Sequence, residues 1–163
     1  MELYKTEVGT DYLRRKSFEN IRKELLFYKN KMKAEYLYFW ADTFFSWTRK
    51  DFEAFAELYQ EIQLPFWCQT RPETINEHRV KTLKKMGVAR IAFGIEHGNE
   101  KFRAKYLDRK TSNEIITEGI KTVLREEVPV SVNNMIGFPY ETRELAFDTI
   151  RLNKTFGAPE IVD

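Results

Sequence analysis

The fold is decided by the stretch Val88–Gly98, which reads VARIAFGIEHG. Its apolar run, Val88–Phe93, passes into a segment that holds two glycines, a carboxylate and a histidine. About forty residues later, Val128–Thr142 (VPVSVNNMIGFPYET) repeats this change and contains a Gly-Phe-Pro turn. Such runs are typical of buried strands that lead into loops, and a helical pattern lies between them. The two stretches predict a β-α-β unit with polar strand ends, where α/β sheets and barrels bind ligands.

The composition permits one globular domain and excludes several other classes. The 163 residues are 42% hydrophobic and carry a net charge of +2, which gives no indication of a nucleic-acid partner. No apolar run approaches the roughly twenty residues of a membrane span. Cys68 is the one cysteine, so we expect no disulfide framework and a cytoplasmic location.

Helical and strand patterns alternate along the whole chain. Helices are expected to begin near Ser17, Thr48, Thr74, Thr111 and Thr142, and strands are expected at 35–40, 65–69, 88–96, 128–136 and 158–163. Thr48, Thr74 and Thr111 each precede an acidic residue by three positions, which is the pattern of a capping box. The alternation implies parallel strands joined by right-handed crossovers.

Two architectures satisfy this order, a doubly wound sheet and a segment of a β/α barrel. The sequence contains neither the Gly-x-Gly-x-x-Gly pattern of dinucleotide-binding sheets nor a Walker-type phosphate loop. We therefore predict an α/β fold, a partial (β/α) TIM-like barrel of about five β/α units with parallel strands. The expected last strand stops as it begins, which suggests that the natural chain continues.

Five motifs, in order, resemble the core of radical S-adenosylmethionine (radical SAM) enzymes. They lie at Arg15–Ser17, at Phe39–Phe44, at Trp67–Arg71, at Met86–Val88 together with Phe93–Gly98, and at Ile136–Thr142. The likeness is greatest to the branch that often carries a cobalamin-binding domain. It implies S-adenosylmethionine as cofactor and a [4Fe–4S] cluster in the parent enzyme, with cobalamin as a further candidate cofactor. The parent would cleave S-adenosylmethionine reductively to a 5′-deoxyadenosyl radical or transfer a methyl group.

The chain departs from the family pattern at the cluster. These enzymes hold it on a Cys-x-x-x-Cys-x-x-Cys loop after their first strand, whereas this chain has only Cys68, on a later strand. We interpret residues 1–163 as a single domain, the interior part of a radical SAM barrel without its first strand and cluster loop. Alone, it is expected to bind no metal and to be inactive.

The resemblance places the cofactor at the carboxyl ends of the strands. Asp42 stands where the family meets the methionine amine, and Glu96 stands where it contacts polar parts of the cofactor. Arg71 is suited to the methionine carboxylate, because a guanidinium can donate to both oxygens. The residues expected around the adenine are Asn134, Met135, Ile136, Gly137 and Pro139. We expect Asp42, Arg71, Glu96 and Gly137 to lie along one edge of the sheet.

Several of these residues also have a structural interpretation. Asp42 could cap a turn, and Glu96 could pair with Arg90 or Arg103. His97 could carry a proton or bind a ligand, but a structural role is the main expectation. Cys68 is expected to be a small buried hydrophobic side chain.

Two other functions stay open at this point. One is a cluster-free α/β module that binds a ligand or partner without catalysis, and the other is an unrelated barrel enzyme with Glu96 as base. The expected partner is a small-molecule cofactor, with no membrane and no clear nucleic acid, and the substrate is not specified. Because a partial barrel leaves open sheet edges, we also expect self-association, with Tyr38, Trp40, Phe66 and Ile91 partly uncovered.

Overall fold

The computed structural model describes residues 15–41 and 43–157 of the chain. The chain divides into two compact units, Met1–Ala34 and Glu35–Asp163. Across the described ranges, no helix has both the length and the apolar character needed to cross a membrane. The expected strand at 158–163 lies outside the described residues.

The first unit contains one described helix, α2 (Phe18–Asn30). Its N-cap is Ser17, whose hydroxyl accepts a hydrogen bond from the amide of Asn20 at 3.2 Å. This bond satisfies one of the amides that a helix leaves unpaired at its start. The predicted start of this helix is confirmed.

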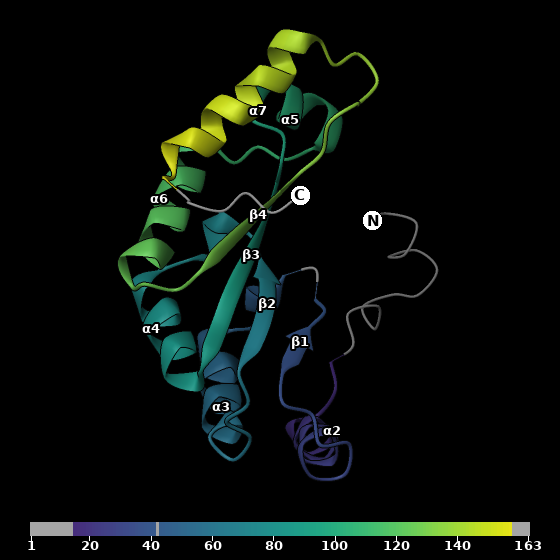
Figure 1. Ribbon diagram of the computed structural model, residues 1–163, viewed down its shortest axis with the longest axis vertical. Coiled ribbons are helices and arrows are strands. Elements are labelled where there is room, and N and C mark those ends of the chain that lie inside the picture. The colour runs from purple at the N-terminus through teal and green to yellow at the C-terminus, as the bar shows by residue number, and fades with distance from the viewer. Residues whose placement is uncertain (1–14, 42, 158–163) are drawn as a thin grey trace. The chain divides into compact units, whose positions relative to one another are not determined.

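The second unit is built on a parallel sheet whose four described strands lie in the order β1-β2-β3-β4 (Figure 1). The strands are β1 (Leu37–Phe39), β2 (Phe66–Thr70), β3 (Val88–Glu96) and β4 (Val130–Asn134). The helices are α3 (Arg49–Tyr59), α4 (Glu77–Met86), α5 (Glu100–Leu107), α6 (Asn113–Arg125) and α7 (Arg143–Thr155), with 3₁₀ turns η2 (Phe44–Ser46) and η3 (Pro72–Thr74). Helices α3, α4 and α6 lie along one side of the sheet (Figure 1). The predicted α/β fold with parallel strands is confirmed.

The sheet has one apolar face and one polar face, because successive side chains of a strand point to opposite sides. The helix face carries buried apolar side chains, namely Phe66, Cys68, Ile91, Phe93, Val130 and Val132. The polar face carries Tyr38, Trp67, Gln69, Arg90, Gly94, Ser131 and Asn133. On the helix face, the ring of Tyr59 from α3 packs 5.1 Å from that of Phe66. On the polar face, the Tyr38 and Trp67 rings stack at 4.6 Å.

This division corrects part of the prediction about uncovered side chains. Tyr38 and Trp40 are exposed, by 37% and 81%, as expected. Phe66 and Ile91 are fully buried instead. They lie on the helix face, which α3, α4 and α6 cover, so the prediction for these two residues was wrong.

Local hydrogen bonds set most helix ends where the sequence placed them. The hydroxyl of Thr48 accepts from the amide of Asp51 at 3.2 Å and donates to its carboxylate at 2.8 Å, which begins α3. Thr142 caps α7 in the same way through the amide of Leu145. Gly87 ends α4 with φ at +89°, a left-handed angle that glycine adopts without a Cβ penalty.

Two predicted capping boxes are wrong. Helix α4 is capped by Asn76, because Thr74 belongs to η3 and its hydroxyl bonds that of Thr70 at 2.8 Å. Helix α6 is capped by Ser112 and not by its neighbour Thr111. In both cases the capping residue lies one or two positions after the predicted threonine.

The inward faces of α6 and α7 also differ in part from the prediction. Ile115 and Ile150, which the helical spacing of apolar residues in the sequence predicts to point inward, are 50% and 42% exposed. Helix α7 buries Thr149 instead, because the hydroxyl of Thr149 accepts a hydrogen bond from the amide of Gly98 at 2.8 Å. A Cβ added to Gly98 would lie 2.3 Å from a carbonyl oxygen of α7, so the glycine permits this close approach.

Candidate functional site

The carboxyl ends of β2, β3 and β4 meet at one edge of the sheet, because the strands are parallel. A small polar pocket of about 280 Å³ opens there. Its lining consists of Gln69, Thr70, Arg71, Gly94, Glu96, Arg109 and Asn133. The structure thus brings the predicted residues Arg71 and Glu96 to one pocket.

Glu96 ends β3 in an unusual backbone conformation. Its φ is +69°, a left-handed value that is uncommon outside glycine, and the register with β4 is irregular between Gly94 and Glu96. Such irregularities re-aim a side chain at the end of a strand. The carbonyl of Glu96 accepts from the amide of Met135 at 2.8 Å, so β4 holds this geometry in place.

The side chain of Glu96 folds back over Gly94. A Cβ added to Gly94 would lie 2.5 Å from Glu96 Oε1, closer than real Cβ contacts allow. A side chain at position 94 would therefore displace the carboxylate. This accounts for the first glycine of the Gly-x-Glu-His-Gly run.

Arg109 is the partner of Glu96. Its Nη1 donates to Glu96 Oε1 at 2.9 Å, and the two side chains are 17% and 24% exposed. Arg109 lies on the loop between α5 and α6, where its amide donates to the carbonyl of Arg103 at 3.2 Å. The expected pairing of Glu96 with Arg90 or Arg103 is not the one observed. Arg103 instead donates to the carbonyls of His97 and Thr111.

Arg71 stands just after β2 and contributes a second cation to the pocket. Its side chain is 53% exposed, and its Nη1 lies 3.9 Å from Glu73 Oε1, at the long end of ion-pair distances. Its carbonyl accepts from the hydroxyl of Thr74 at 2.6 Å, which fixes the backbone at this point. The pocket therefore holds two guanidinium groups and one carboxylate.

The expected adenine turn follows β4 and does not line this pocket. Asn134 ends β4 opposite Glu96, and Met135 and Ile136 are 44% and 69% exposed. Gly137 has φ at +93°, and an added Cβ would meet no atom within 4 Å. Glycine is thus required at this position by the backbone angle, and not because another atom approaches the Cα closely. Pro139 follows in the same exposed turn.

One predicted binding residue, Asp42, lies outside the described residues. Its role at the methionine amine stays a prediction of the family resemblance.

A mainly structural role was predicted for His97, and its contacts are all with other residues of the protein. The imidazole is fully buried, and its Nε2 lies 3.0 Å from Glu141 Oε1. Glu141 is a residue that sequence reasoning did not single out. The only sequence signal for the pair is that both follow a glycine-containing strand end.

The described residues do not fit an iron–sulfur cluster. Cys68 is buried on the helix face, and burial raises the pKa of its thiol to about 12. Clusters are held by thiolates, which this environment disfavours. Among the residues that the structure describes, no group of three or more His, Cys, Asp or Glu side chains could hold a metal ion.

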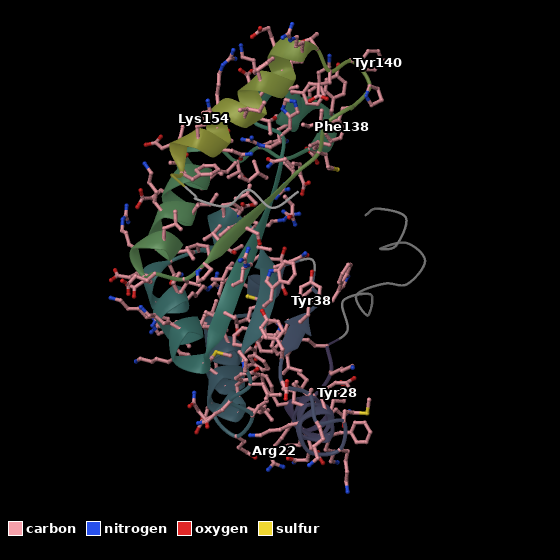
Figure 2. All side chains as sticks on the ribbon, in the orientation of Figure 1. Arg22, Tyr28, Tyr38, Phe138, Tyr140 and Lys154 are labelled. Carbon is pink, nitrogen blue, oxygen red and sulfur yellow. The ribbon has the colours of Figure 1, made fainter. Side chains whose placement is uncertain are left out.

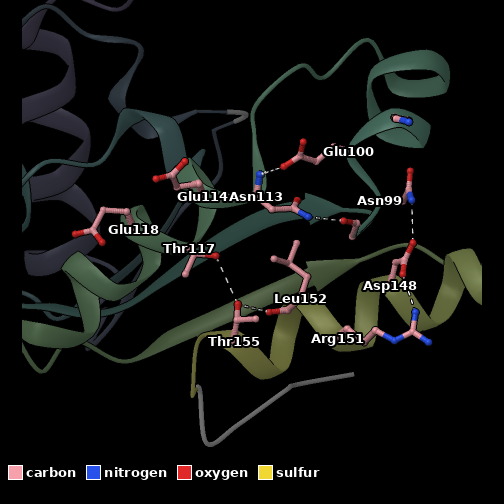
Figure 3. A pocket seen from close by; sticks show the side chains of 12 residues that line it. Asn99, Glu100, Asn113, Glu114, Thr117, Glu118, Asp148, Arg151, Leu152 and Thr155 are labelled. Carbon is pink, nitrogen blue, oxygen red and sulfur yellow. Dashed lines mark hydrogen bonds and ion pairs between the residues drawn. The ribbon is translucent and has the colours of Figure 1, made fainter.

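A larger hollow lies away from the strand ends, between α5, α6 and α7 (Figure 3). Its volume is about 850 Å³, and its polar side chains largely bond one another. The Asp148 carboxylate accepts hydrogen bonds from Asn99 and Arg151, both at 2.8 Å. The hydrogen bond from Asn99 is the main cause that lowers the pKa of the Asp148 carboxyl. We regard the smaller pocket as the candidate site, because two of the predicted residues, Arg71 and Glu96, meet there.

Comparison with known families identifies the class of protein. The sequence matches the family model of the Radical SAM superfamily over residues 4–152. The match covers most of the chain, which therefore belongs to this superfamily. The comparison with curated proteins found no match.

Solved structures share the fold at low sequence identity. Coproporphyrinogen III oxidase (HemN) from Escherichia coli, a radical SAM enzyme, has a TM-score of 0.67 and 16% identity over 85% of this chain. The methyltransferase TsrM from Kitasatospora setae, with cobalamin and a [4Fe–4S] cluster bound, has a TM-score of 0.70 and 13% sequence identity over 88% of this chain. The cobalamin-dependent enzyme OxsB, with aqua-cobalamin bound, has a TM-score of 0.73 and 15% sequence identity over 92% of this chain. This chain spans 34%, 30% and 24% of those three chains.

Proposed function

We propose that this chain is the S-adenosylmethionine-binding part of a radical SAM enzyme. The observation that carries the proposal is the pocket in which Arg71, Glu96 and Arg109 meet at the carboxyl ends of parallel strands. S-adenosylmethionine offers a carboxylate, an ammonium group and a ribose diol. Two guanidinium groups and one carboxylate are matched to these groups in charge and hydrogen bonding.

Each residue has a role that follows from its chemistry. Arg109 occupies one oxygen of Glu96, which leaves the other oxygen to accept hydrogen bonds from the ribose hydroxyls. Arg71 is the more exposed guanidinium and takes the methionine carboxylate. The turn at Gly137 and Pro139 follows Met135, whose amide donates to the carbonyl of Glu96, and in the proposal it takes the adenine. Asp42, in the proposal as in the prediction, takes the methionine amine.

The reaction itself belongs to the parent enzyme. A [4Fe–4S] cluster supplies the electron for reductive cleavage in this superfamily, and the described residues do not fit such a cluster. The protein's own contribution here is to bind and orient the cofactor. We therefore propose that the chain alone is inactive, and that cluster ligands, substrate contacts and any cobalamin site lie in other parts of the parent.

Calorimetric titration of the chain with S-adenosylhomocysteine, which keeps the amino acid, ribose and adenine, tests the proposal. We expect saturable binding by the wild type and a loss of about tenfold or more in affinity for Glu96→Gln and for Arg71→Met, since each removes a charge-assisted hydrogen bond. Arg125→Met is the matched control. It removes an exposed arginine that pairs with Glu118 on α6, so its affinity should equal that of the wild type.

The same titration separates the proposal from its rivals. Absence of binding by the folded wild type, or equal losses in Arg125→Met and Arg71→Met, would contradict it. Binding without any dependence on Glu96 would place the ligand elsewhere on the molecule.

A further inference from the structure

A buried hydrogen-bonded pair joins the end of β3 to the turn after β4. His97 Nε2 and Glu141 Oε1 lie 3.0 Å apart, and the two side chains are 0% and 4% exposed. They are 44 positions apart in the sequence. The sequence motifs around the two residues are thus connected directly through this contact.

The hydrogen bonds fix the tautomer of His97. The amide of Asn99 donates to Nδ1 at 3.0 Å, so Nδ1 carries no proton. Nε2 therefore carries the hydrogen and donates to Glu141 Oε1. A neutral imidazole is thus held between the N-cap of α5 and the carboxylate of Glu141.

The second oxygen of Glu141 holds the turn itself. Oε2 accepts from the amide of Gly137 at 2.5 Å and from the amide of Phe138 at 3.3 Å. The amide of Glu141 in turn donates to the carbonyl of Phe138 at 3.0 Å. One carboxylate therefore organises the backbone of the whole Gly-Phe-Pro turn.

Ring packing supports the same connection. The imidazole of His97 stacks on Phe102 of α5 at 4.3 Å, and Phe138 lies 5.7 Å from Phe102. Phe138 and Tyr140 lie on the turn between β4 and α7 (Figure 2). The turn contains two left-handed residues, Gly137 at φ +93° and Tyr140 at φ +68°. A non-glycine residue keeps such an angle only where its surroundings enforce it.

We propose that the His97–Glu141 pair is a positioning device that fixes this turn in the shape that recognises the purine ring of the cofactor. The proposal rests on the proposed function, and it adds two residues that touch no ligand themselves. Without the pair, Glu141 would lose its buried donor, and the amides of Gly137 and Phe138 would lose their fixed direction. The turn would then sample several conformations, and recognition of the purine edge would weaken.

Purine discrimination is the property that a purely structural role would not change. Adenine carries a donor at position 6, whereas hypoxanthine carries an acceptor there. The proposal assigns the amino group at this position to a main-chain carbonyl of the turn, which would favour S-adenosylhomocysteine over S-inosylhomocysteine. A general loss of stability would lower both affinities by the same factor.

The test uses two variants and one matched control in the full chain. His97→Phe keeps a ring against Phe102 but removes both hydrogen bonds, and Glu141→Gln keeps size while removing the charge and one acceptor. Thr149→Val is the control, because it removes a buried hydrogen bond to Gly98 in the same region but does not touch the turn. Affinities for the two nucleosides are measured by calorimetry. Exchange of the Gly137 and Phe138 amides is measured by NMR.

We expect the wild type to prefer the adenine compound by about tenfold, the factor of a single well-placed hydrogen bond. In His97→Phe and Glu141→Gln this preference should fall to about twofold or less, and the two amides should exchange at least tenfold faster. Thr149→Val should lower the melting temperature and keep both properties. If His97→Phe does not fold, Glu141→Gln decides the outcome.

Two results would overturn the inference while leaving the proposed function intact. One is unchanged exchange of the Gly137 amide in both variants. The other is an unchanged adenine preference in variants whose turn exchanges faster. Failure of the wild type to bind either compound would instead contradict the proposed function, and faster exchange in the variants would still support the role of the pair in holding the turn.

Discussion

The two faces of the sheet differ in chemistry although they share the same strands. On the helix face, Phe66, Cys68 and Ile91 are fully buried under α3, α4 and α6. On the polar face, Gln69 donates to the hydroxyl of Tyr38 at 2.6 Å, and Trp40 is 81% exposed. Parallel sheets are usually apolar on both faces, because helices cover both. The polar face is thus the exception, which agrees with the cofactor site proposed at the carboxyl ends of its strands.

The comparison shows that stability and ligand chemistry are divided between the faces. Apolar burial on the helix face supplies the folding free energy. The polar face gives up part of that burial to hold groups such as Gly94 and Asn133 beside the pocket. Substitutions on the first face should therefore change stability, and substitutions on the second should change binding.

The largest effect is expected from truncating Phe66. Its ring packs within 5.3 Å of Phe39 and 5.1 Å of Tyr59, so Phe66→Ala leaves a cavity and should cost about 3–5 kcal/mol of unfolding free energy. Tyr38→Ala, on the polar face, loses a stack on Trp67 and should cost about 1 kcal/mol. Urea unfolding measures both. Equal costs would break the distinction between the faces.

Two glycines give the next largest effect. A Cβ at Gly119 would lie 2.5 Å from the backbone oxygen of Pro72, so Gly119→Ala must shift α6 and should cost about 1–2 kcal/mol, after the better helix propensity of alanine. A Cβ at Gly94 clashes with the movable carboxylate of Glu96 and lies at an ordinary contact distance of 3.8 Å from Arg109 Nη1. Gly94→Ala should change the free energy of unfolding by less than about 0.5 kcal/mol. It should lower the affinity for S-adenosylhomocysteine about tenfold. Thermal unfolding and calorimetry on both variants provide the check, and a reversed pattern would refute it.

Cys68 offers a pH-dependent test of burial on the helix face. Burial raises the pKa of its thiol from 9.0 to about 12, so the folded state keeps the proton when the unfolded state has lost it. The contribution of this group to stability is fully present below about pH 9 and is lost as the pH rises toward 12. The native thiol should also react with maleimide far more slowly than the unfolded thiol.

Cys68→Val is the control for this test, because it keeps an apolar side chain without a titrating group. Its stability between pH 9 and pH 12 should fall less steeply than that of the wild type. Identical slopes, or rapid labelling of the folded chain, would mean that the thiol is accessible.

The smallest effect concerns association through the exposed edge of the polar face. Trp40 and Tyr38 form an edge-to-face pair at 5.4 Å, and Trp40 is the most exposed large apolar side chain of the described residues. We expect weak self-association, and Trp40→Glu should shift it toward monomer by a few-fold in dissociation constant. Light scattering across a wide concentration range decides this. A strict monomer in the wild type would contradict the expectation.

Apart from α5, which the sequence did not predict as a regular helix, the sequence by itself determined the alternation of helices and strands from α2 to α7 and most helix starts. The caps at Ser17, Thr48 and Thr142 were predictable because capping is local. Each hydroxyl bonds an amide only three positions further along the chain. Thr74 and Thr111 were predicted as caps from the same kind of local pattern, and both predictions were wrong. The hydroxyl of Thr74 bonds Thr70, and Ser112, beside Thr111, was an equally good cap. Local sequence patterns thus predict that a helix is present. Which residue caps the helix depends on the path of the chain before it.

Only the tertiary structure decided how the site is assembled. The sequence placed Arg71 and Glu96 at strand ends, and parallel strands bring such ends together. It could not identify Arg109 as the partner of Glu96, because the path of the loop between α5 and α6 determines which cation arrives there. Nor could it pair His97 with Glu141. Contacts between residues 13 and 44 positions apart depend on packing, which a local pattern does not encode.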